Sequence, residues 1–377
     1  MITIADIQLY PVRLRPARSD AATTESDSDN SAYASVIVKV ITDSSLVGFG
    51  EAINMPGRSV SAGMEALRLS AAALIGSDAL NPNEIGRRID NAVEGIQTQW
   101  PEVRAALEMA VYDLIGKVRR VPTYSVFGGA YRTEIEMCAT LQAGKPEETA
   151  FEAKQLVKQG YRGLGISVGG ESGSLEQDQR AVLAILDTVS DDIPVTVLAN
   201  ECWENAEQVR SFFAAILTNS FYGNLAVEQP LPRQDLDGHA ELRETLPISV
   251  VLNQSVVSPQ VMAQIAHDAA ADRIALNVCH VGGLSRANKI VHTCDSAAIG
   301  VSVRAPFSTR LGLAAHAHLA SIIRDPLPVD LGIDPTPTED PFSGGFDMID
   351  GRLVLGDRPG LGVDLDEEIL TSMTIDA

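Results

Sequence analysis

The sequence has few cysteines, no long apolar segment and no recognisable leader. The four cysteines are Cys138, Cys202, Cys279 and Cys294. They lack the paired spacing of zinc sites or disulfide frameworks, which indicates reduced thiols in a cytoplasmic protein. No stretch approaches the roughly 20 apolar residues that a membrane span needs. Since the N-terminus has no basic region followed by an apolar run, we expect no signal peptide.

Basic residues are scarce as well, with 29 Lys and Arg against 50 Asp and Glu and a formal net charge of -21. Phosphate backbones and anionic membranes repel so acidic a chain, so we expect neither as a partner. The 377 residues are 45% apolar, which is enough for one large barrel or two domains with a sizeable core. These properties favour a small molecule as the partner.

The first part of the chain combines strand and helix patterns. Residues 2–14 alternate like a strand, and residues 34–52 have the pattern of a hairpin. Apolar stripes at helical spacing follow over Gly63–Gly76 and Pro101–Val118. We therefore predict an α+β domain over residues 1–130.

From Glu134 onward, short β-branched runs alternate with helical patterns. The runs begin at residues 134, 163, 194, 224, 248, 273, 300 and 328. Their spacing of roughly 25–30 residues is the length of a βα unit, and eight such strands predict a parallel barrel over residues 131–339. No glycine-rich phosphate-binding motif follows a strand, which weakens a dinucleotide interpretation. We expect the tail, residues 340–377, to return to the first domain.

Active sites of such barrels lie at the carboxyl ends of the strands. The polar residues at the predicted ends are Ser167, Asn200, Glu228, Asn253, Gln254, Asn277, Cys279 and Arg304. Side chains alternate along a strand, so Cys279 shares the inward orientation of Asn277.

Six motifs in register resemble the enolase superfamily, in its mandelate racemase and muconate lactonizing branch. They are VGFGEA at residues 47–52, AALEMAVYDLIGK at 105–117, ANECW at 199–203, VEQP at 227–230, VGGLSRA at 281–287 and PGLGVDLDE at 359–367. The resemblance covers nearly the whole chain. It implies an α/β fold in which an α+β capping domain, built from both termini, packs on a modified (β/α)7β TIM-like barrel.

The resemblance also implies a reaction, removal of a proton next to a carboxylate, with the enolate stabilised by a divalent metal, usually magnesium. Family members carry three acidic ligands on consecutive strands. Here these positions correspond to Leu198, Glu228 and Asn253. One carboxylate and one amide make a poor Mg²⁺ site, so we predict no tight metal there. We also expect no other cofactor. Mg²⁺ is expected only if the family chemistry survives.

The family's acid and base positions are also substituted. A lysine pair of the lactonizing branch corresponds to Gly165 and Ser167, and a further lysine corresponds to Asn277. The Asp and His of the racemase branch correspond to Asn277 and Arg304. Two acidic positions are replaced by Gln254 and Ser308. Because the framework motifs are intact, we interpret the change as a repurposed pocket, although decay is an alternative.

Glu228, Cys279 and Arg304 are the catalytic candidates. A desolvated Glu228 suits a general acid or base, but it could equally be held by Asn200 or Asn253 as part of the scaffold. Cys279 could face the substrate or be a buried, inert thiol. Arg304 could bind a carboxylate or phosphate of a ligand, or pair with an interior acid such as Glu228.

The remaining candidates would bind substrate. They are Ser167, Asn200, Trp203, Asn253, Gln254, Asn277, Ser308 and Arg58. Trp203 is predicted to form a pocket wall. Arg58 lies on a loop that, by the resemblance, comes from the capping domain and touches the substrate. Residues 17–32 are polar and acidic, which is typical of a solvated loop or of a lid over a site.

Three functions are consistent with this pattern. The first is a metal-independent isomerase, lyase or cyclase that acts on an activated or cyclic substrate, with Glu228 moving a proton. The second is a conventional Mg²⁺-dependent racemase, dehydratase or cycloisomerase, and the third is a non-catalytic binding or scaffold protein. The resemblance also implies a homo-oligomer.

Overall fold

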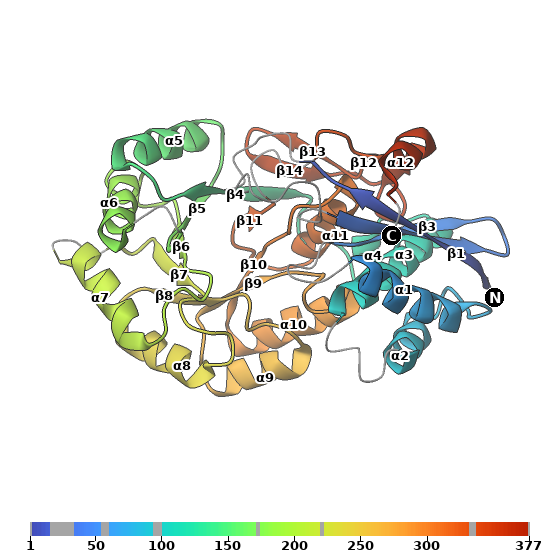
Figure 1. Ribbon diagram of the computed structural model, residues 1–377, viewed down its shortest axis with the longest axis horizontal. Helices are drawn as coiled ribbons and strands as arrows, with labels where there is room; N and C mark the ends of the chain where they lie inside the picture. Colours follow the sequence, from blue (N-terminus) through green and yellow to red (C-terminus); the bar gives the residue numbers. More distant parts are fainter. Residues whose placement is uncertain are drawn as a thin grey trace.

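The computed structural model describes residues 2–15, 34–53, 60–92, 100–170, 174–218, 222–331 and 337–375. The capping part begins with the antiparallel sheet β1-β2-β3 and continues with helices (Figure 1). Its elements are β1 (Ile4–Arg13), β2 (Ala34–Thr42), β3 (Val47–Ala52), α1 (Val60–Leu74), α2 (Pro82–Ala92), α3 (Pro101–Arg119) and α4 (Thr123–Val126). The predicted hairpin and both predicted helices are therefore present.

The VGFGEA motif lets α3 pack directly on β3. A Cβ at Gly48 would lie 2.2 Å from the carbonyl oxygen of Ala110, and one at Gly50 would lie 1.9 Å from that of Ala106. Side chains at these positions are excluded by backbone atoms that have no room to move. Helix α3 begins at Pro101 and is buried on nearly every face from Val103 to Gly116, as expected for a helix enclosed by its neighbours.

We expect Gly50→Ala to lower the free energy of unfolding by about 3 kcal/mol or more, because α3 has to move away from the sheet. Urea denaturation would measure the change. The matched control is Gly356→Ala, since a Cβ there would meet no atom within 4 Å, and its effect should stay within about 0.5 kcal/mol. Equal effects of the two substitutions would contradict this account of the packing.

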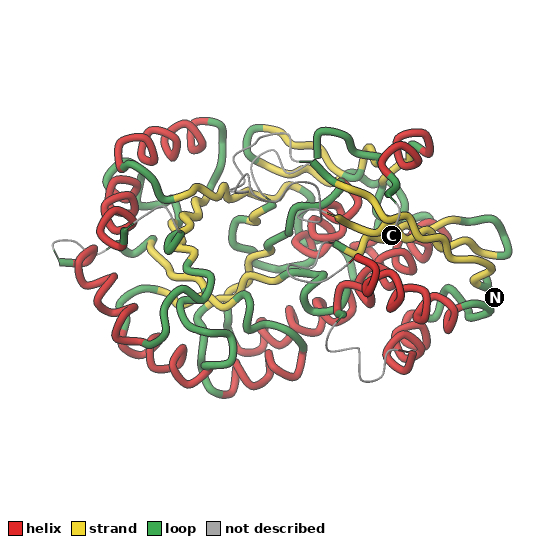
Figure 2. Tube along the Cα trace, in the orientation of Figure 1, coloured by secondary structure: helices red, strands yellow, loops and turns green. Residues whose placement is uncertain are grey.

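The second part of the chain alternates strands and helices in the predicted order. Its strands are β4 (Glu134–Gln142), β5 (Gly163–Ser167), β6 (Val195–Leu198), β7 (Leu225–Glu228), β8 (Ser249–Leu252), β9 (Arg273–Leu276), β10 (Gly300–Val303) and β11 (Val329–Asp330). Its helices are α5 (Pro146–Lys158), α6 (Leu175–Leu186), α7 (Ala206–Leu217), α8 (Leu236–Thr245), α9 (Pro259–His267), α10 (Leu284–Ala297) and α11 (Arg310–Ser321). Strands β4 to β10 pair in sequence order, all parallel, and helices lie outside them (Figure 2).

The short strand β11 lies between β4 and β10. It pairs in parallel with β4 at Met137 and Cys138. Toward β10 it makes single bridges, with Arg304 opposite Asp330, and the N–H of Ala305 donates to the carbonyl of Asp330 at 2.9 Å. The predicted eighth strand is therefore hydrogen-bonded to both neighbours, although it forms a continuous ladder with β4 alone.

The tail contacts both parts of the chain. Its elements are β12 (Phe342–Gly344), β13 (Phe346–Ile349), β14 (Arg352–Leu355), β15 (Val363–Leu365) and α12 (Glu367–Met373). Strand β14 pairs antiparallel with the first residues of β4, because β11 covers that edge only at later residues. The last residues do return to the capping part, where the N–H of Ile375 donates to the carbonyl of Pro11 at 2.8 Å. The domain boundaries near residues 130 and 339 stay a prediction.

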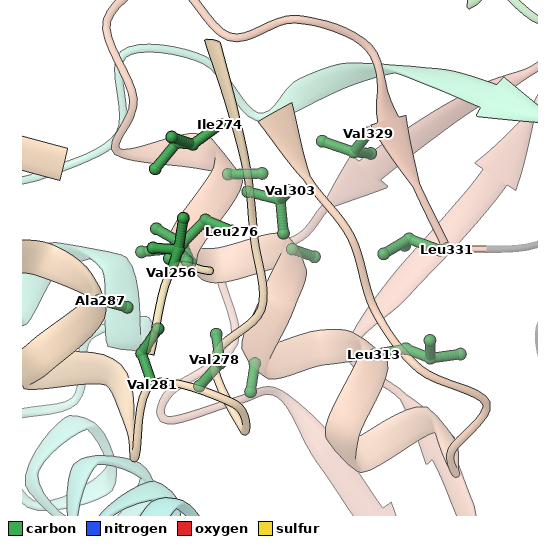
Figure 3. Packing of buried hydrophobic residues seen from close by; sticks show 14 of the residues in the cluster. Val256, Ile274, Leu276, Val278, Val281, Ala287, Val303, Leu313, Val329 and Leu331 are labelled. Atoms are coloured by element: carbon green, nitrogen blue, oxygen red, sulfur yellow. The ribbon is translucent and has the colours of Figure 1, made fainter. Parts of the chain in front are cut away.

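One large hydrophobic core joins the strands to their covering helices. Figure 3 shows Ile274 and Leu276 of β9 and Val303 of β10 beside Ala287 of α10 and Leu313 of α11, all of them buried. Such a close-packed interior holds strand ends in fixed relative positions. None of the helices in the described ranges has the length and apolar character needed to cross a bilayer.

Candidate functional site

The centre of the candidate site is Glu228, the last residue of β7. Its strand is buried along its whole length, and the residue itself is 3% exposed. One carboxylate oxygen accepts a hydrogen bond from Asn253 Nδ2 at 2.8 Å. The other accepts from Arg304 Nη2 at 2.9 Å. The structure thus brings together three of the predicted residues, each from a different strand end.

Arg304 also contacts a carboxylate that sequence reasoning missed. Its Nη1 donates to Asp330 Oδ2 at 2.5 Å, and Thr140 Oγ1 donates to the same oxygen at 2.5 Å. Asp330 is 5% exposed. Burial opposes the charged guanidinium, but the carboxylates of Glu228 and Asp330 outweigh it and raise the pKa of Arg304 above its usual value. The sequence signal that could have identified Asp330 is its position as an acidic residue within the apolar run PVDLGI.

These contacts favour the second interpretation of Arg304, pairing with an interior acid. Both terminal nitrogens of its guanidinium are bound to carboxylates of the protein. The guanidinium is therefore paired with interior acids in this structure, as the second interpretation expects. The guanidinium also places a positive charge beside the buried Glu228 carboxylate. Of the two predicted partners, Asn253 contacts Glu228, whereas Asn200 bonds elsewhere.

A cavity of about 40 Å³ lies within the barrel, with Glu228, Arg304 and Asp330 in its lining. The lining also includes Pro194 and Arg273, which lie where strands begin. This cavity has room for a few water molecules.

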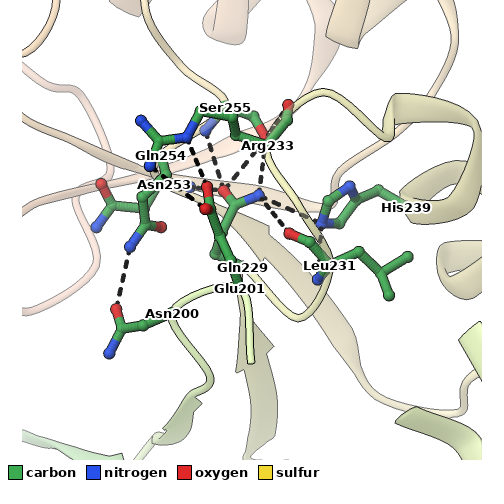
Figure 4. A network of polar contacts seen from close by, with 9 residues as sticks. All are labelled: Asn200, Glu201, Gln229, Leu231, Arg233, His239, Asn253, Gln254 and Ser255. Atoms are coloured by element: carbon green, nitrogen blue, oxygen red, sulfur yellow. Dashed lines mark hydrogen bonds and ion pairs between the residues drawn. The ribbon is translucent and has the colours of Figure 1, made fainter. Parts of the chain in front are cut away.

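A second network shapes the loops around these ends (Figure 4). The buried Gln229 accepts hydrogen bonds from the N–H groups of Asn253 and Ser255 at 3.1 and 3.0 Å, and its Nε2 donates to Ser255 Oγ at 2.8 Å. Gln254 Nε2 donates to Asn200 Oδ1 at 3.0 Å. The network thus positions Asn253, Asn200 and Gln254, three of the predicted substrate-binding residues, relative to one another.

Three residues in these loops adopt left-handed backbone angles. Asn200, Glu201 and Gln229 have φ values of 49°, 67° and 45°. Such conformations cost free energy in non-glycine residues and are often found at functional sites. Glu201 is held by an ion pair with Arg233 at 2.7 Å, which neutralises its charge beside the site.

Asn277 shapes a turn beyond β9. Its side-chain carbonyl accepts hydrogen bonds from the N–H groups of Cys279 and His280 at 2.9 and 3.2 Å. Behind it, His316 Nδ1 donates to the carbonyl of Gly312 and its Nε2 accepts from the N–H of Val278. Burial lowers the pKa of His316 to about 4, so the ring is neutral. The neutral, buried ring supports a packing role for His316. The side-chain carbonyl of Asn277 stabilises the turn.

Other predicted residues lie apart from Glu228 or outside the described ranges. Cys279 is buried against Ile53 and Ala105, and burial raises the pKa of its thiol well above 9. These surroundings fit the inert thiol and not a nucleophile. Ser167 ends β5 and is half-buried. Arg58 and the segment 17–32 fall outside the described residues.

Trp203 and Ser308 lie apart from Glu228, and their predicted roles in substrate binding stay predictions. The ring of Trp203 packs at an angle against those of Phe212 and Phe213 of α7, with centroids 5.0 and 6.3 Å apart, and it belongs to the hydrophobic core. Ser308 is fully buried at the start of α11, beside Gly312, where a Cβ would also meet Glu51. Neither side chain forms part of the Glu228 cluster.

Glu51 of β3 joins the capping part to α11. It is fully buried and accepts hydrogen bonds from Thr309 Oγ1 at 2.5 Å and from the N–H groups of Thr309 and Gly312 at 3.2 Å. Burial raises the pKa of Glu51 to about 7, and the carboxylate of Asp340 adds to the rise. Burial likewise raises the pKa of Asp340 to about 6, although the N–H groups of Phe342 and Arg310 oppose it.

A raised folded-state pKa means that ionisation of Glu51 destabilises the fold. Its contribution to stability is complete below pH 4.5 and is lost as the pH rises through about 7. We expect Glu51→Gln to be more stable than the wild type by roughly 2–3 kcal/mol at pH 8, with the difference vanishing toward pH 4.5. Urea denaturation across this range, with exposed Glu176→Gln as the control, would measure it. A constant difference at all pH values would argue against titration of Glu51.

The three positions expected to bind a divalent metal do not fit one. Leu198 offers no oxygen, Glu228 is already bound to a guanidinium, and Asn253 directs its NH₂ group toward Glu228. No group of three or more His, Cys, Asp or Glu side chains suited to a metal occurs within the described ranges. We therefore derive no step through a metal.

Parallel barrel strands with polar groups converging at their carboxyl ends define a class of α/β-barrel enzymes. The chain belongs to the mandelate racemase and muconate lactonizing enzyme family. Residues 11–128 match the model "Mandelate racemase / muconate lactonizing enzyme, N-terminal domain", and residues 148–369 match "Enolase C-terminal domain-like". The resemblance and the fold class predicted from the sequence are thereby confirmed.

The similar proteins include racemases, epimerases, cycloisomerases and a dehydratase. An N-succinyl-L-Arg/Lys racemase from Bacillus cereus is 27% identical over 99% of this chain and 98% of its own, and its crystal structure gives a TM-score of 0.87 at 26% identity, with the same coverage. A hydrophobic dipeptide epimerase from Enterococcus faecalis is 30% identical over 87% of this chain and 91% of its own. Muconate cycloisomerase 1 from Rhodococcus opacus is 26% identical over 90% of each chain. The chain is thus an isomerase-type or lyase-type enzyme.

Proposed function

We propose that the chain is an isomerase, lyase or cyclase for a small activated or cyclic substrate and that it works without a divalent metal. One observation carries this proposal. The single carboxylate left at the expected metal-ligand positions, Glu228, is bound by Asn253 and Arg304 instead. A metal would have to displace a guanidinium that is itself held by a second carboxylate.

In this proposal Glu228 accepts a proton from the substrate. The electrons of the broken C–H bond stay on the substrate, and the proton returns from the carboxylate to the same carbon or to a conjugated one, so that atoms and charge balance. Arg304 and Asn253 hold the two carboxylate oxygens in place, which fixes the direction of transfer. Asn200, Gln254, Ser167 and Asn277 would orient the substrate by hydrogen bonds.

Two properties of the site restrict the substrate. Glu228 is 3% exposed, so the reacting C–H bond has to be inserted against it, which favours a compact or flat molecule. Glu228, Arg304 and Asp330 together carry two negative charges and one positive charge. Such a cluster disfavours a second localised anion, so the substrate itself has to delocalise the charge that develops. An activated C–H bond satisfies this condition, whereas one next to a plain carboxylate does not.

The relatives favour a second function, a conventional metal-dependent racemase or epimerase. A racemase acting on N-succinyl-Arg/Lys and a dipeptide epimerase are among them. Under this alternative, N-succinyl amino acids and dipeptides would exchange their α-proton with solvent when the enzyme is supplied with Mg²⁺. These compounds therefore form the first panel to be tested.

Metal analysis and deuterium exchange separate the two functions. The purified protein should contain no stoichiometric Mg²⁺ or Mn²⁺, and EDTA should not change its activity. Incubation with the panel in D₂O, followed by mass spectrometry, should show no α-deuteration. Stoichiometric metal together with EDTA-sensitive turnover would refute the proposal. The predicted cytoplasmic location and homo-oligomeric state are kept as part of this proposal.

A further inference from the structure

Two buried carboxylates converge on one guanidinium inside the barrel. Glu228 is the last residue of β7, and Asp330 lies on β11. Arg304 directly follows β10, which comes between β7 and β11 in the sequence. The ion-pair distances are 2.9 Å to Glu228 and 2.5 Å to Asp330. Since both acids are at most 5% exposed, neither charge can be solvated by bulk water in place of the guanidinium.

The surroundings of the guanidinium are those of a cation site. Thr140 Oγ1 bonds the same oxygen of Asp330 that receives Arg304, and the Asn253 amide bonds Glu228. Carboxylate and hydroxyl oxygens are among the ligands that hard divalent cations prefer. The remaining nitrogen of the guanidinium, Nε, is buried without a partner among the described residues. The protein therefore holds Arg304 here mainly through the two carboxylates.

We propose that Glu228 and Asp330 form a cation site within the barrel and that Arg304 is its permanent occupant. The guanidinium takes the electrostatic place of a divalent metal and thereby excludes one from the strand ends. Removing the guanidinium should open the site to Mg²⁺ or Mn²⁺. This inference explains why the proposed function needs no metal. Only this explanation rests on the proposed function; the cation site itself does not.

Binding of Mn²⁺, followed by electron paramagnetic resonance, tests the proposal without any substrate. The full-length wild type and Arg304→Lys should bind no Mn²⁺ up to millimolar concentration, because a cation already occupies the site. Arg304→Ala leaves two carboxylates and free volume, so it should bind one Mn²⁺ with a dissociation constant of about 10⁻⁴–10⁻³ M. Excess Mg²⁺ should compete for the site. Adding Asp330→Asn to Arg304→Ala should weaken Mn²⁺ binding at least about tenfold.

A matched control is available on the surface. Arg210 also contacts two carboxylates, Glu207 and Glu241, at 3.1 and 2.6 Å, but all three side chains are at least 34% exposed. Arg210→Ala should therefore gain no Mn²⁺ site, because water solvates the released acids. Mn²⁺ binding by Arg210→Ala as strong as that by Arg304→Ala would overturn the proposal.

Thermal unfolding provides a second measurement in case Arg304→Ala is poorly folded. Its midpoint should rise on addition of Mn²⁺, whereas the midpoints of the wild type and Arg304→Lys should not change. A folded Arg304→Ala that binds no Mn²⁺, or wild-type binding of Mn²⁺ that Glu228→Gln abolishes, would overturn the proposal. EDTA-sensitive wild-type activity with Mn²⁺ bound elsewhere would instead refute the proposed function and leave this site intact.

Discussion

Arg304→Met is expected to lower the free energy of unfolding by about 3–5 kcal/mol, because it leaves two buried carboxylates without their counter-ion. The methionine fills similar volume, so the loss reflects charge more than packing. Glu228 and Asp330 are 3% and 5% exposed, which prevents bulk water from replacing the guanidinium. Urea denaturation at pH 7, with parallel fluorescence and circular dichroism, would measure the change.

Two controls separate buried charge from other effects. Arg210→Met removes a surface guanidinium that also contacts two carboxylates, and it should cost less than about 1 kcal/mol. Combining Arg304→Met with Glu228→Gln and Asp330→Asn removes all three charges and should recover most of the stability. If Arg304→Met cost no more than Arg210→Met, the interior ion pairs would not contribute as described.

Glu228→Gln is expected to reduce kcat/KM by about 10²–10⁴-fold, which is the usual contribution of a positioned acid–base group. Glutamine is isosteric and retains an acceptor for Asn253, so the fold should persist. The assay would use whichever compound of a substrate screen is turned over, with stability followed in parallel. Substrate binding should be retained, because proton transfer is the step that is lost.

Asp330→Asn is the matched comparison, because Asp330 pairs with the same guanidinium but is not proposed to accept the proton. It should weaken the ion pair yet reduce kcat/KM much less than Glu228→Gln does. Equal losses from both substitutions would mean that Glu228 acts solely as a counter-ion. An unchanged biological phenotype for Glu228→Gln would favour the scaffold function.

The arrangement of strands and helices could be predicted from the sequence because its signals are local. Period-two and period-3.6 patterns depend on neighbouring residues, and a parallel barrel brings its strand ends together whatever the side chains. The residues after those strands, such as Glu228 and Asn253, could therefore be assigned to one site. The intact glycines of VGFGEA and the helix at Ala105–Lys117 likewise carried the family resemblance.

The partners of these residues were decided by the tertiary structure. Asp330 and Arg304 are 26 residues apart, and their contact depends on how β11 lies between β4 and β10. Trp203 follows a strand end, yet its ring turns outward to Phe212 and Phe213, because the loop geometry beyond the strand sets its direction. Strand parity could not settle Cys279 either, since β9 ends before it, at Leu276.

The sequence alone determined the family and the fold class, and it predicted the loss of the expected acidic ligands. Only the tertiary structure decided which groups contact the remaining acid, because Asn253 and Arg304 lie far from Glu228 in the chain. The excess of acidic residues, 50 against 29 basic ones, gave no indication that a guanidinium lies beside Glu228. That contact depends on the packing of three strands, which no local pattern specifies.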